Sequence, residues 1–311
     1  MQAKEKLMGI CALCCKLKEL TGEHIIAAWI GRLVGPDVPG TISYYDYLGE
    51  NTVERSDYAD RGGHKNCTIP VLCGPCNSEW SNRIQEETRK FLKPVLEGER
   101  RFLSATERQQ LAIWMSLFII VRQFLHPKLA AICEAQRLTF RNSVTNIRPS
   151  RPSKRPTPTT NGSPLPGIKV WIAPFEGTEN NFASYYTGFR IGDFIHPDAG
   201  PDGLNAYMSI AAFGNTLIFA LGGNERNILN MCTETNIAIG QILRGLGLTQ
   251  VWPNYSSFPL TSSNTLLTDQ DFESIPTIIQ ALLPTLGVDS SINIIPIYGE
   301  PLDSSYFPRR Y

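Results

Sequence analysis

The sequence predicts an α+β protein in which a small cysteine-bearing unit precedes a larger β-rich unit. Runs of β-branched and aromatic residues gather between positions 168 and 221, and segments with apolar residues at helical spacing lie on both sides of them. Two Cys-x-x-Cys pairs mark the unit that comes first. We expect a cysteine-bearing domain over 1–100, a helical segment over 101–146, a Pro-rich linker or loop over 147–167, and an α+β domain of unassigned role over 168–311.

The first hundred residues are expected to form short strands and turns followed by a helix. Residues 41–47 are rich in β-branched and aromatic types and predict a strand, whereas 57–66 is polar, contains two adjacent glycines and predicts a loop. Apolar residues then recur at helical spacing from Asn77 or Ser78 onward. Pro94 is expected to kink or end this helix, because proline lacks the amide hydrogen that an inner turn needs.

The helical segment begins with a recognisable start signal. Ser104-Ala-Thr-Glu107 has the spacing of a capping box, so we expect a second helix there, with Trp114 in the core. A third helix is expected over 128–141, after Pro127. Residues 147–167 contain six prolines and several cations, so they are either a solvated linker or a loop that contacts phosphate groups.

The C-terminal part reads as several strands and then helices, an α+β order. A hairpin turn is expected at Gly214-Asn215. The predicted strands cover 168–175, 184–191, 206–213 and 216–221, and the predicted helices cover 236–244 and 269–283.

Composition points to a soluble globular protein, with 42% hydrophobic and 19% charged residues. No apolar run reaches the roughly 20 residues of a membrane span, and the N-terminal residues lack the apolar core of a signal peptide, so we expect a cytoplasmic protein. The net charge is zero, but residues 1–155 carry 23 Lys and Arg against 16 Asp and Glu, whereas 156–311 carry 6 against 13. The basic half either faces a polyanion such as DNA or is a chance imbalance of solvated surfaces.

The cysteine spacing predicts a structural zinc site. Two residues between the cysteines of each pair allow both sulfurs to reach one ion, and the clustering is more typical of metal binding than of disulfides. Cys15 or Cys67 as a ligand instead, or cysteines that are only buried, remain alternatives. The expected ligands are Cys11, Cys14, Cys73 and Cys76.

Between the two cysteine pairs lies the dipeptide Glu23-His24, and Asn77 follows the second pair directly. This arrangement, with Leu20-x-x-Glu-His-Ile-x-x-x-Trp29 and Cys-Asn-x-x-Trp80, resembles the HNH endonucleases of the cysteine-bearing ββα-metal type. The pattern looks closer still to a bacterial HNH group with Glu-His and Cys-x-x-Cys-Asn motifs. The specific motif covers about residues 11–92, and the likeness of the remaining chain is diffuse.

The resemblance implies an N-terminal ββα-metal nuclease domain and assigns roles to its residues. Glu23 and Asn77 would bind a catalytic Mg²⁺ or Mn²⁺, and His24 would be the general base that activates water. The position of the family's middle Asn holds Thr68, so Asn66 is the nearest substitute, with His64 close by. Glu23 stands where many members have Asp, and its longer side chain would displace the ion.

These features lead to a hypothesis of a metal-dependent endonuclease that hydrolyses DNA, with a role in defence or restriction. One alternative is a catalytically inactive, zinc-stabilised module that binds nucleic acid. Another is a nuclease effector that a partner or ligand regulates through the C-terminal domain. A homodimer or a partner protein is also expected. The cations of the helix after Asn77 either contact phosphates or form surface pairs such as Glu86–Lys90; they are Arg83, Arg89, Lys90 and Lys93.

Overall fold

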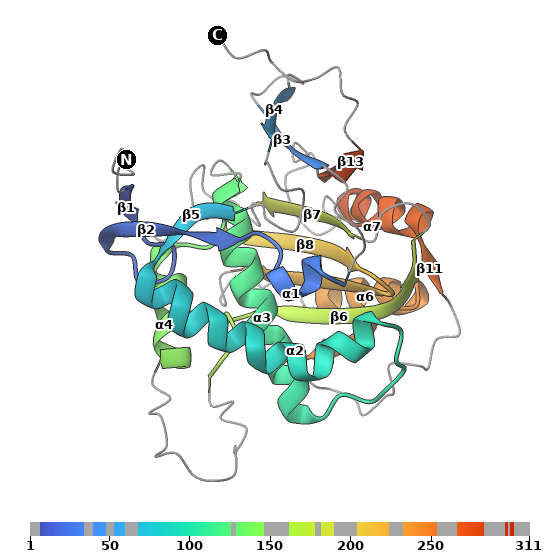
Figure 1. The fold of residues 1–311 in the computed structure, drawn as a ribbon. Helices are drawn as coiled ribbons and strands as arrows, with labels where there is room; N and C mark the ends of the chain where they lie inside the picture. The colour runs from blue at the N-terminus through green and yellow to red at the C-terminus, as the bar shows by residue number, and fades with distance from the viewer. Residues whose placement is uncertain are drawn as a thin grey trace.

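The computed structural model describes most of the chain in several stretches (Figure 1). These are residues 7–33, 40–47, 53–59, 68–125, 129–145, 162–177, 182–189, 204–223, 233–253, 266–282, 296–297 and 299–301. Helices and strands are mixed throughout, which confirms the prediction of an α+β protein at that level. Within these stretches, no helix is long and apolar enough to cross a membrane.

A small sheet opens the fold, in the strand order β1-β2-β5. β1 (Met8–Ile10) and β2 (Leu17–His24) form a hairpin, and β2 pairs antiparallel with β5 (Thr68–Cys73). The short α1 (Ala28–Gly31) follows β2. A second small sheet has the order β13-β3-β4; its strands are Gly40–Tyr47 (β3), Val53–Ala59 (β4) and Gly299–Pro301 (β13). The predicted strand over 41–47 therefore exists, whereas the predicted loop from 57 begins too early, because β4 stays paired to Ala59.

After β5 the chain winds into helices. A π-helical stretch, η2 (Cys76–Ser81), leads into α2 (Asn82–Leu96), so the helix predicted from Asn77 or Ser78 is present. Pro94 lies inside α2, two residues before its end, in the last turn. α3 (Ala105–Arg122) begins with the predicted capping box: Ser104 accepts from the Glu107 amide, and the Glu107 carboxylate accepts from the Ser104 amide. The 3-10 turn η3 (Gln123–Leu125) follows α3.

The third helix starts later than predicted. α4 covers Glu134–Thr145 rather than 128–141, and Pro127 lies outside the described residues. Of the predicted linker or loop over 147–167, residues 147–161 lie outside the described residues. Residues 162–167 form no helix or strand, and they are fastened to the core. The Leu165 amide donates to Ser116 Oγ at 2.9 Å, and Gln109 Nε2 donates to the Gly162 carbonyl at 2.6 Å, so this end of the loop is fastened to α3.

The C-terminal part is a seven-stranded sheet. Six strands follow the order β10-β6-β9-β8-β7-β12, and the seventh, β11, pairs in parallel with β6. The four predicted strands and two predicted helices are all present, with bounds that differ by up to three residues. The strands are Lys169–Glu176 (β6), Phe182–Phe189 (β7), Ala206–Phe213 (β8), Thr216–Gly223 (β9), Thr249–Trp252 (β10), Leu267–Thr268 (β11) and Pro296–Ile297 (β12). The helices are Thr233–Gly245 (α6) and Asp269–Leu282 (α7).

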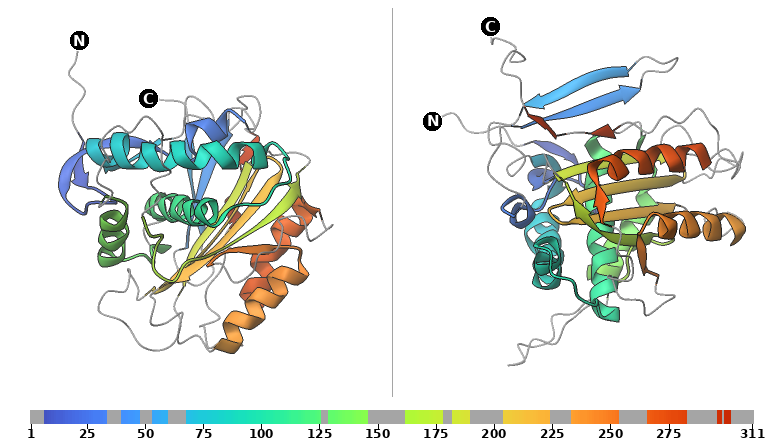
Figure 2. Two further views of the ribbon diagram at one scale, coloured as in Figure 1. Left: turned by 90° about the horizontal axis from the view of Figure 1, so that it is seen from below. Right: turned by 90° about the vertical axis from the view of Figure 1, so that its right-hand side faces the viewer.

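Helices cover both faces of this sheet, so the centre of the molecule has three layers (Figure 2). α2 and α3 lie on one face, and α6 and α7 lie on the other. All eight residues of β8 are buried, as are all eight of β9. Side chains alternate along a strand, so a strand buried along its whole length must be covered on both sides.

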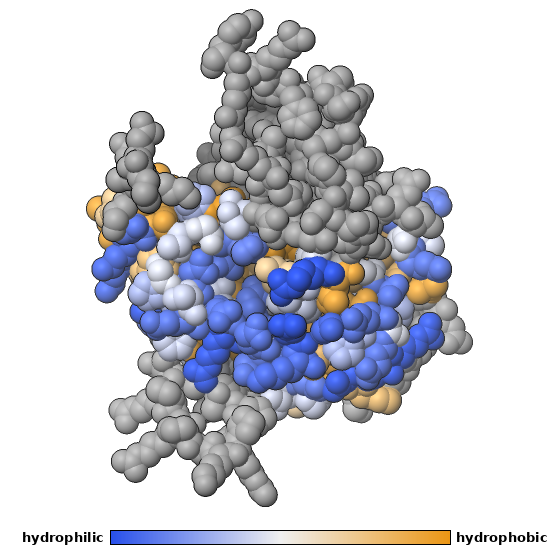
Figure 3. Space-filling model, in the orientation of Figure 1, coloured by the Kyte–Doolittle hydropathy of each residue, from blue (hydrophilic) through white to orange (hydrophobic). Residues whose placement is uncertain are grey.

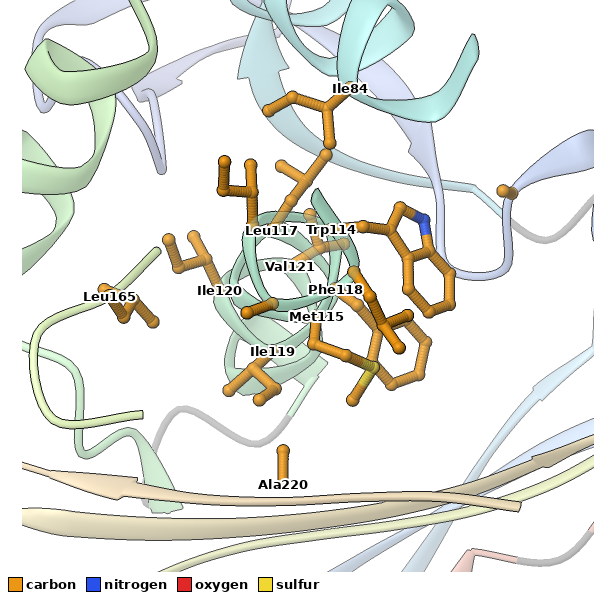
Figure 4. Close-up of a cluster of buried hydrophobic side chains, with 14 of the residues drawn as sticks. Ile84, Trp114, Met115, Leu117, Phe118, Ile119, Ile120, Val121, Leu165 and Ala220 are labelled. Carbon is orange, nitrogen blue, oxygen red and sulfur yellow. The ribbon is translucent and has the colours of Figure 1, made fainter. Parts of the chain in front are cut away.

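α3 is the central helix of the layer next to the small sheet. Every residue from Gln110 to Arg122 is buried, and a helix that is enclosed on all sides belongs to the interior. Figure 4 shows Ile84 of α2 on one side of it, Leu165 on another and Ala220 of the sheet below. The Trp114 and Phe118 rings both lie about edge-on to Phe213, with ring centroids 5.7 Å away. One hydrophobic core therefore joins the cysteine-bearing unit, the helices and the C-terminal sheet.

Candidate metal centre

Four cysteines meet where the small sheet joins η2. Cys11 and Cys14 lie at the turn between β1 and β2, Cys73 ends β5, and Cys76 begins η2. All four are buried, and their sulfur atoms lie within 4.8 Å of one another. The Cys14 and Cys73 sulfurs are 3.8 Å apart, and a tetrahedral zinc ion with Zn–S bonds of about 2.3 Å holds its sulfurs about 3.8 Å from each other. The cluster is compatible with a metal site such as structural zinc.

The backbone holds this cluster in place through its own hydrogen bonds. The Cys15 amide donates to the Cys11 carbonyl at 2.9 Å and closes the first turn, and the Cys73 amide donates to Cys11 Sγ at 3.3 Å. The Ala12 amide donates to the Val71 carbonyl at 2.8 Å. Val71 is the extra residue of a bulge in β5, because Thr21 pairs with Leu72 whereas Gly22 pairs with Pro70. The bulge thus turns one carbonyl of β5 toward the first cysteine turn.

The thiols of the cluster differ in acidity. A hydrogen bond with Cys76 lowers the pKa of Cys11 to about 4, and the same bond together with burial raises the pKa of Cys76. Burial raises the pKa of Cys14. The enclosed site therefore stabilises one thiolate and opposes further negative charge. A bound divalent cation offsets that repulsion, which is why thiolate sites release protons when they take metal.

Cys15 is not part of the cluster. Its φ angle of 53° lies in the left-handed region, and its sulfur lies 4.0 Å from the Glu134 carbonyl at the start of α4. Cys67, the other alternative ligand, lies outside the described residues.

Glu23 lies in β2 with a side chain that is only 5% exposed. Ser81 Oγ donates a hydrogen bond to Glu23 Oε1 at 2.8 Å. Burial raises the pKa of Glu23 to about 7, and the Ser81 hydrogen bond offsets part of that effect. The carboxyl group therefore titrates near neutrality, in contrast to an ordinary surface glutamate.

His24 is the last residue of β2 and is partly buried, with Thr68 as its partner across the sheet. Because neighbouring side chains leave a strand on opposite faces, Glu23 and His24 diverge while the strand is regular. The chain bends at Ile25 and Ile26, directly after His24. The predicted Asn66, like the nearby His64, lies outside the described residues.

Asn77 is the second residue of η2, directly after the fourth cysteine, and its side chain reaches back to β2. Its Nδ2 donates to the Gly22 carbonyl at 2.8 Å and to Thr21 Oγ1 at 3.1 Å. A hydrogen bond therefore links Gly22, next to Glu23, to Asn77, next to Cys76. Neither Thr21 nor Ser81 stood out in the sequence, because their contacts with Asn77 and Glu23 depend on how β2, β5 and η2 are registered.

The cations of α2 are engaged mostly within the helix. Arg89 pairs with Glu86 at 3.8 Å, Lys90 with Glu87 at 2.6 Å and Lys93 with Glu97 at 3.6 Å. These are local surface pairs of the kind expected as the alternative to phosphate contacts, although Lys90 pairs with Glu87 rather than with Glu86. The outward side of α2 is accordingly a mixed hydrophilic surface in Figure 3.

Comparison of the chain with protein-family models, with curated proteins and with solved structures finds no match. The site is therefore interpreted from its own residues and geometry.

Proposed function

We propose that this protein is a metal-dependent endonuclease of the HNH type that hydrolyses phosphodiester bonds in DNA. The observation that carries the proposal is the hydrogen bond from Asn77 Nδ2 to the Gly22 carbonyl, at 2.8 Å. It joins the helix start after the second cysteine pair to the strand that carries Glu23 and His24. The three residues that the resemblance singles out therefore belong to one small region, next to four clustered cysteines.

The donor set suits two different cations. Thiolates prefer zinc, and the four cysteines would hold it as a structural ion. The Glu23 carboxylate and the Asn77 amide oxygen are hard ligands of the kind that Mg²⁺ and Mn²⁺ accept. Burial that raises the pKa of Glu23 also strengthens its attraction to a neighbouring cation, since charge interactions are stronger where water is excluded.

Each residue would have a separate task in the reaction. Glu23 and Asn77 would hold a divalent ion, which would stabilise the negative charge that develops on the phosphate and the leaving oxygen. His24, placed at the end of β2, would accept a proton from the attacking water, as a neutral imidazole does in general base catalysis. Ser81 holds one oxygen of Glu23, so the carboxylate keeps one orientation during the reaction.

A plasmid-cleavage assay tests this proposal. Purified wild-type protein is compared with His24→Ala in the presence of Mg²⁺, Mn²⁺ or no added divalent ion, with zinc content measured on the same samples. We expect cleavage only with added ion, and a loss of roughly 10²- to 10⁴-fold in rate for His24→Ala at unchanged zinc content. Undiminished cleavage by a clean preparation of the variant contradicts the assignment.

The burial of Glu23 favours a second candidate, a zinc-stabilised nucleic-acid-binding module without catalysis. A carboxyl group that is 5% exposed and already bonded to Ser81 can act as a structural group of the small sheet. Salt-sensitive DNA binding without nicking in Mg²⁺ or Mn²⁺ selects this candidate over the nuclease.

A further inference from the structure

The side-chain amide of Asn77 has a fixed orientation. An amide nitrogen carries two hydrogens, and the two acceptors within reach of Asn77 Nδ2 are the Gly22 carbonyl and Thr21 Oγ1. The Gly22 carbonyl can only accept, so it is the nitrogen of the amide that faces β2. Both hydrogens are then used, and the amide oxygen is the atom left to face away from β2.

Thr21 can accept that bond because its own hydrogen is already used. Thr21 Oγ1 donates to the Leu72 carbonyl at 2.9 Å, across the β2–β5 pair. The hydroxyl oxygen therefore presents its lone pairs to Asn77. A directed chain of hydrogen bonds results, from Asn77 through Thr21 to Leu72, with every donor matched to an acceptor.

This chain of hydrogen bonds ends at the β5 segment that supports the cysteines. Leu72 lies between Val71, whose carbonyl holds the first cysteine turn, and Cys73, one of the four clustered residues. The bulge at Val71 changes the register between Thr21 and Gly22, which is the point that Asn77 bridges. The position of the cysteine cluster is therefore linked, through Leu72 and Thr21, to the orientation of the Asn77 side-chain amide.

We propose that Thr21 is a positioning residue that, together with the Gly22 carbonyl, holds the Asn77 amide oxygen toward the divalent cation that Asn77 and Glu23 would bind. This inference rests on the proposed function. Mg²⁺ and Mn²⁺ demand oxygen ligands in a well-defined geometry, and an amide that is free to rotate presents its nitrogen to the ion in part of the population. Groups that orient metal ligands typically contribute about 10- to 100-fold to metal affinity.

The test is Mn²⁺ binding to the zinc-loaded full-length protein, measured from the electron paramagnetic resonance signal of free Mn²⁺. Thr21→Val removes the hydroxyl at nearly constant volume, and Thr21→Ser keeps it. We expect Kd for Mn²⁺ to rise roughly 10-fold in Thr21→Val and to stay within about threefold of wild type in Thr21→Ser. Thr139→Val is the matched control, because its hydroxyl also donates to a main-chain carbonyl but lies in α4.

A second variant keeps the inference testable if Thr21→Val is unstable. Asn77→Asp adds a negative charge beside the ion, so charge alone predicts tighter Mn²⁺ binding. The aspartate has no hydrogens to donate to Gly22 and Thr21, so loss of orientation predicts weaker binding. We expect weaker binding, and tighter binding overturns the positioning role.

The outcomes separate this inference from the proposed function. If Asn77→Ala weakens Mn²⁺ binding but Thr21→Val does not, the positioning role is wrong and the cation site stands. If the wild-type protein binds no Mn²⁺ beyond its zinc, or Asn77→Ala binds it unchanged, both ideas are wrong. Failure of Thr21→Ser to restore the affinity also overturns the role of the hydroxyl.

Discussion

Thr216 Oγ1 donates a hydrogen bond to the main-chain carbonyl of Val95 at 3.0 Å, which joins the C-terminal sheet to the last turn of α2. The neighbouring Asn215 amide donates to the Leu96 carbonyl at the same distance. The last carbonyls of a helix have no partner within the helix. The Gly98 amide donates to the Val95 carbonyl, and residues 215 and 216, at the start of β9, add the hydrogen bonds to Val95 and Leu96. The helix that starts at the cysteine cluster is therefore capped by a distant part of the chain.

This contact predicts that the N-terminal half does not fold by itself. A fragment of residues 1–146 would expose the face of α3 that packs on Phe213 and Ala220, and the Leu96 carbonyl at the end of α2 would lose its hydrogen bond from Asn215. We expect it to be insoluble, or soluble but loosely packed, with strong binding of a dye that reports exposed apolar surface. A monodisperse fragment with a cooperative thermal transition would show that the shared core is dispensable.

Trp114 is predicted to be one of the most sensitive core positions. Its ring is buried against Phe118 and Phe213, and its Nε1 donates to Gln85 Oε1 at 2.8 Å. We expect Trp114→Ala to lower the free energy of unfolding by about 3–5 kcal/mol and Trp114→Phe by about 1–2 kcal/mol in urea denaturation. Phe102→Ala is the control, since that ring is 65% exposed and should change stability by less than about 0.5 kcal/mol.

The raised pKa of Glu23 predicts a pH dependence of stability. The folded protein holds this proton with a pKa of about 7, against an ordinary 4.5. Between these pH values the unfolded chain loses the proton first, so the contribution to stability is full below about pH 4.5 and falls as pH rises through 7. We expect a loss on the order of 2 kcal/mol across this window, measured by urea denaturation without added Mg²⁺ or Mn²⁺.

Glu23→Gln isolates this contribution, because the amide cannot titrate and still accepts a hydrogen bond from Ser81. The difference in unfolding free energy between wild type and variant should change between pH 5 and pH 8, whereas effects of the cysteines cancel. A constant difference would mean that the carboxyl group is not perturbed by burial.

The cysteine cluster predicts a metal content that depends on four thiols and not on their neighbours. We expect about one zinc per chain in the wild type, and loss of that zinc with a melting temperature roughly 10 °C lower in Cys76→Ser. Cys15→Ser is the matched control, because Cys15 follows a cluster residue directly but its sulfur lies against the Glu134 carbonyl. Equal zinc in Cys76→Ser and wild type would exclude a four-cysteine site.

Local sequence patterns predicted most helices and strands of this fold, but they could not predict which of these elements contact each other. The β-branched and aromatic runs located β6 to β9, and the capping box located α3, since both signals are encoded in neighbouring residues. The full burial of β8 depends on helices that lie far away in the sequence on both sides. The start of α4 was predicted at residue 128, directly after Pro127, because no signal in the sequence marked Glu134 as the first helical residue.

The site shows the same division. The spacing of the cysteines was sufficient to predict the cluster, because two pairs that share one ion must meet. The orientation of Glu23 was not predictable, since a shift of one residue in the β2–β5 register would turn it to the other face. No sequence pattern marks Thr21 or Ser81. Their roles follow only from their hydrogen bonds with Asn77 and Glu23.

The enclosure of α3 beneath β8 and β9 imposes an order of events on the nascent chain. Synthesis at about 5–20 residues per second needs roughly 5–20 s to add the roughly 100 residues between Arg122 and Gly223. During that interval the apolar α3 segment has been synthesised, but the strands β8 and β9 that cover it have not. We expect the emerging polypeptide to depend on chaperones that shield such segments, and to aggregate when translation pauses before β9 is complete.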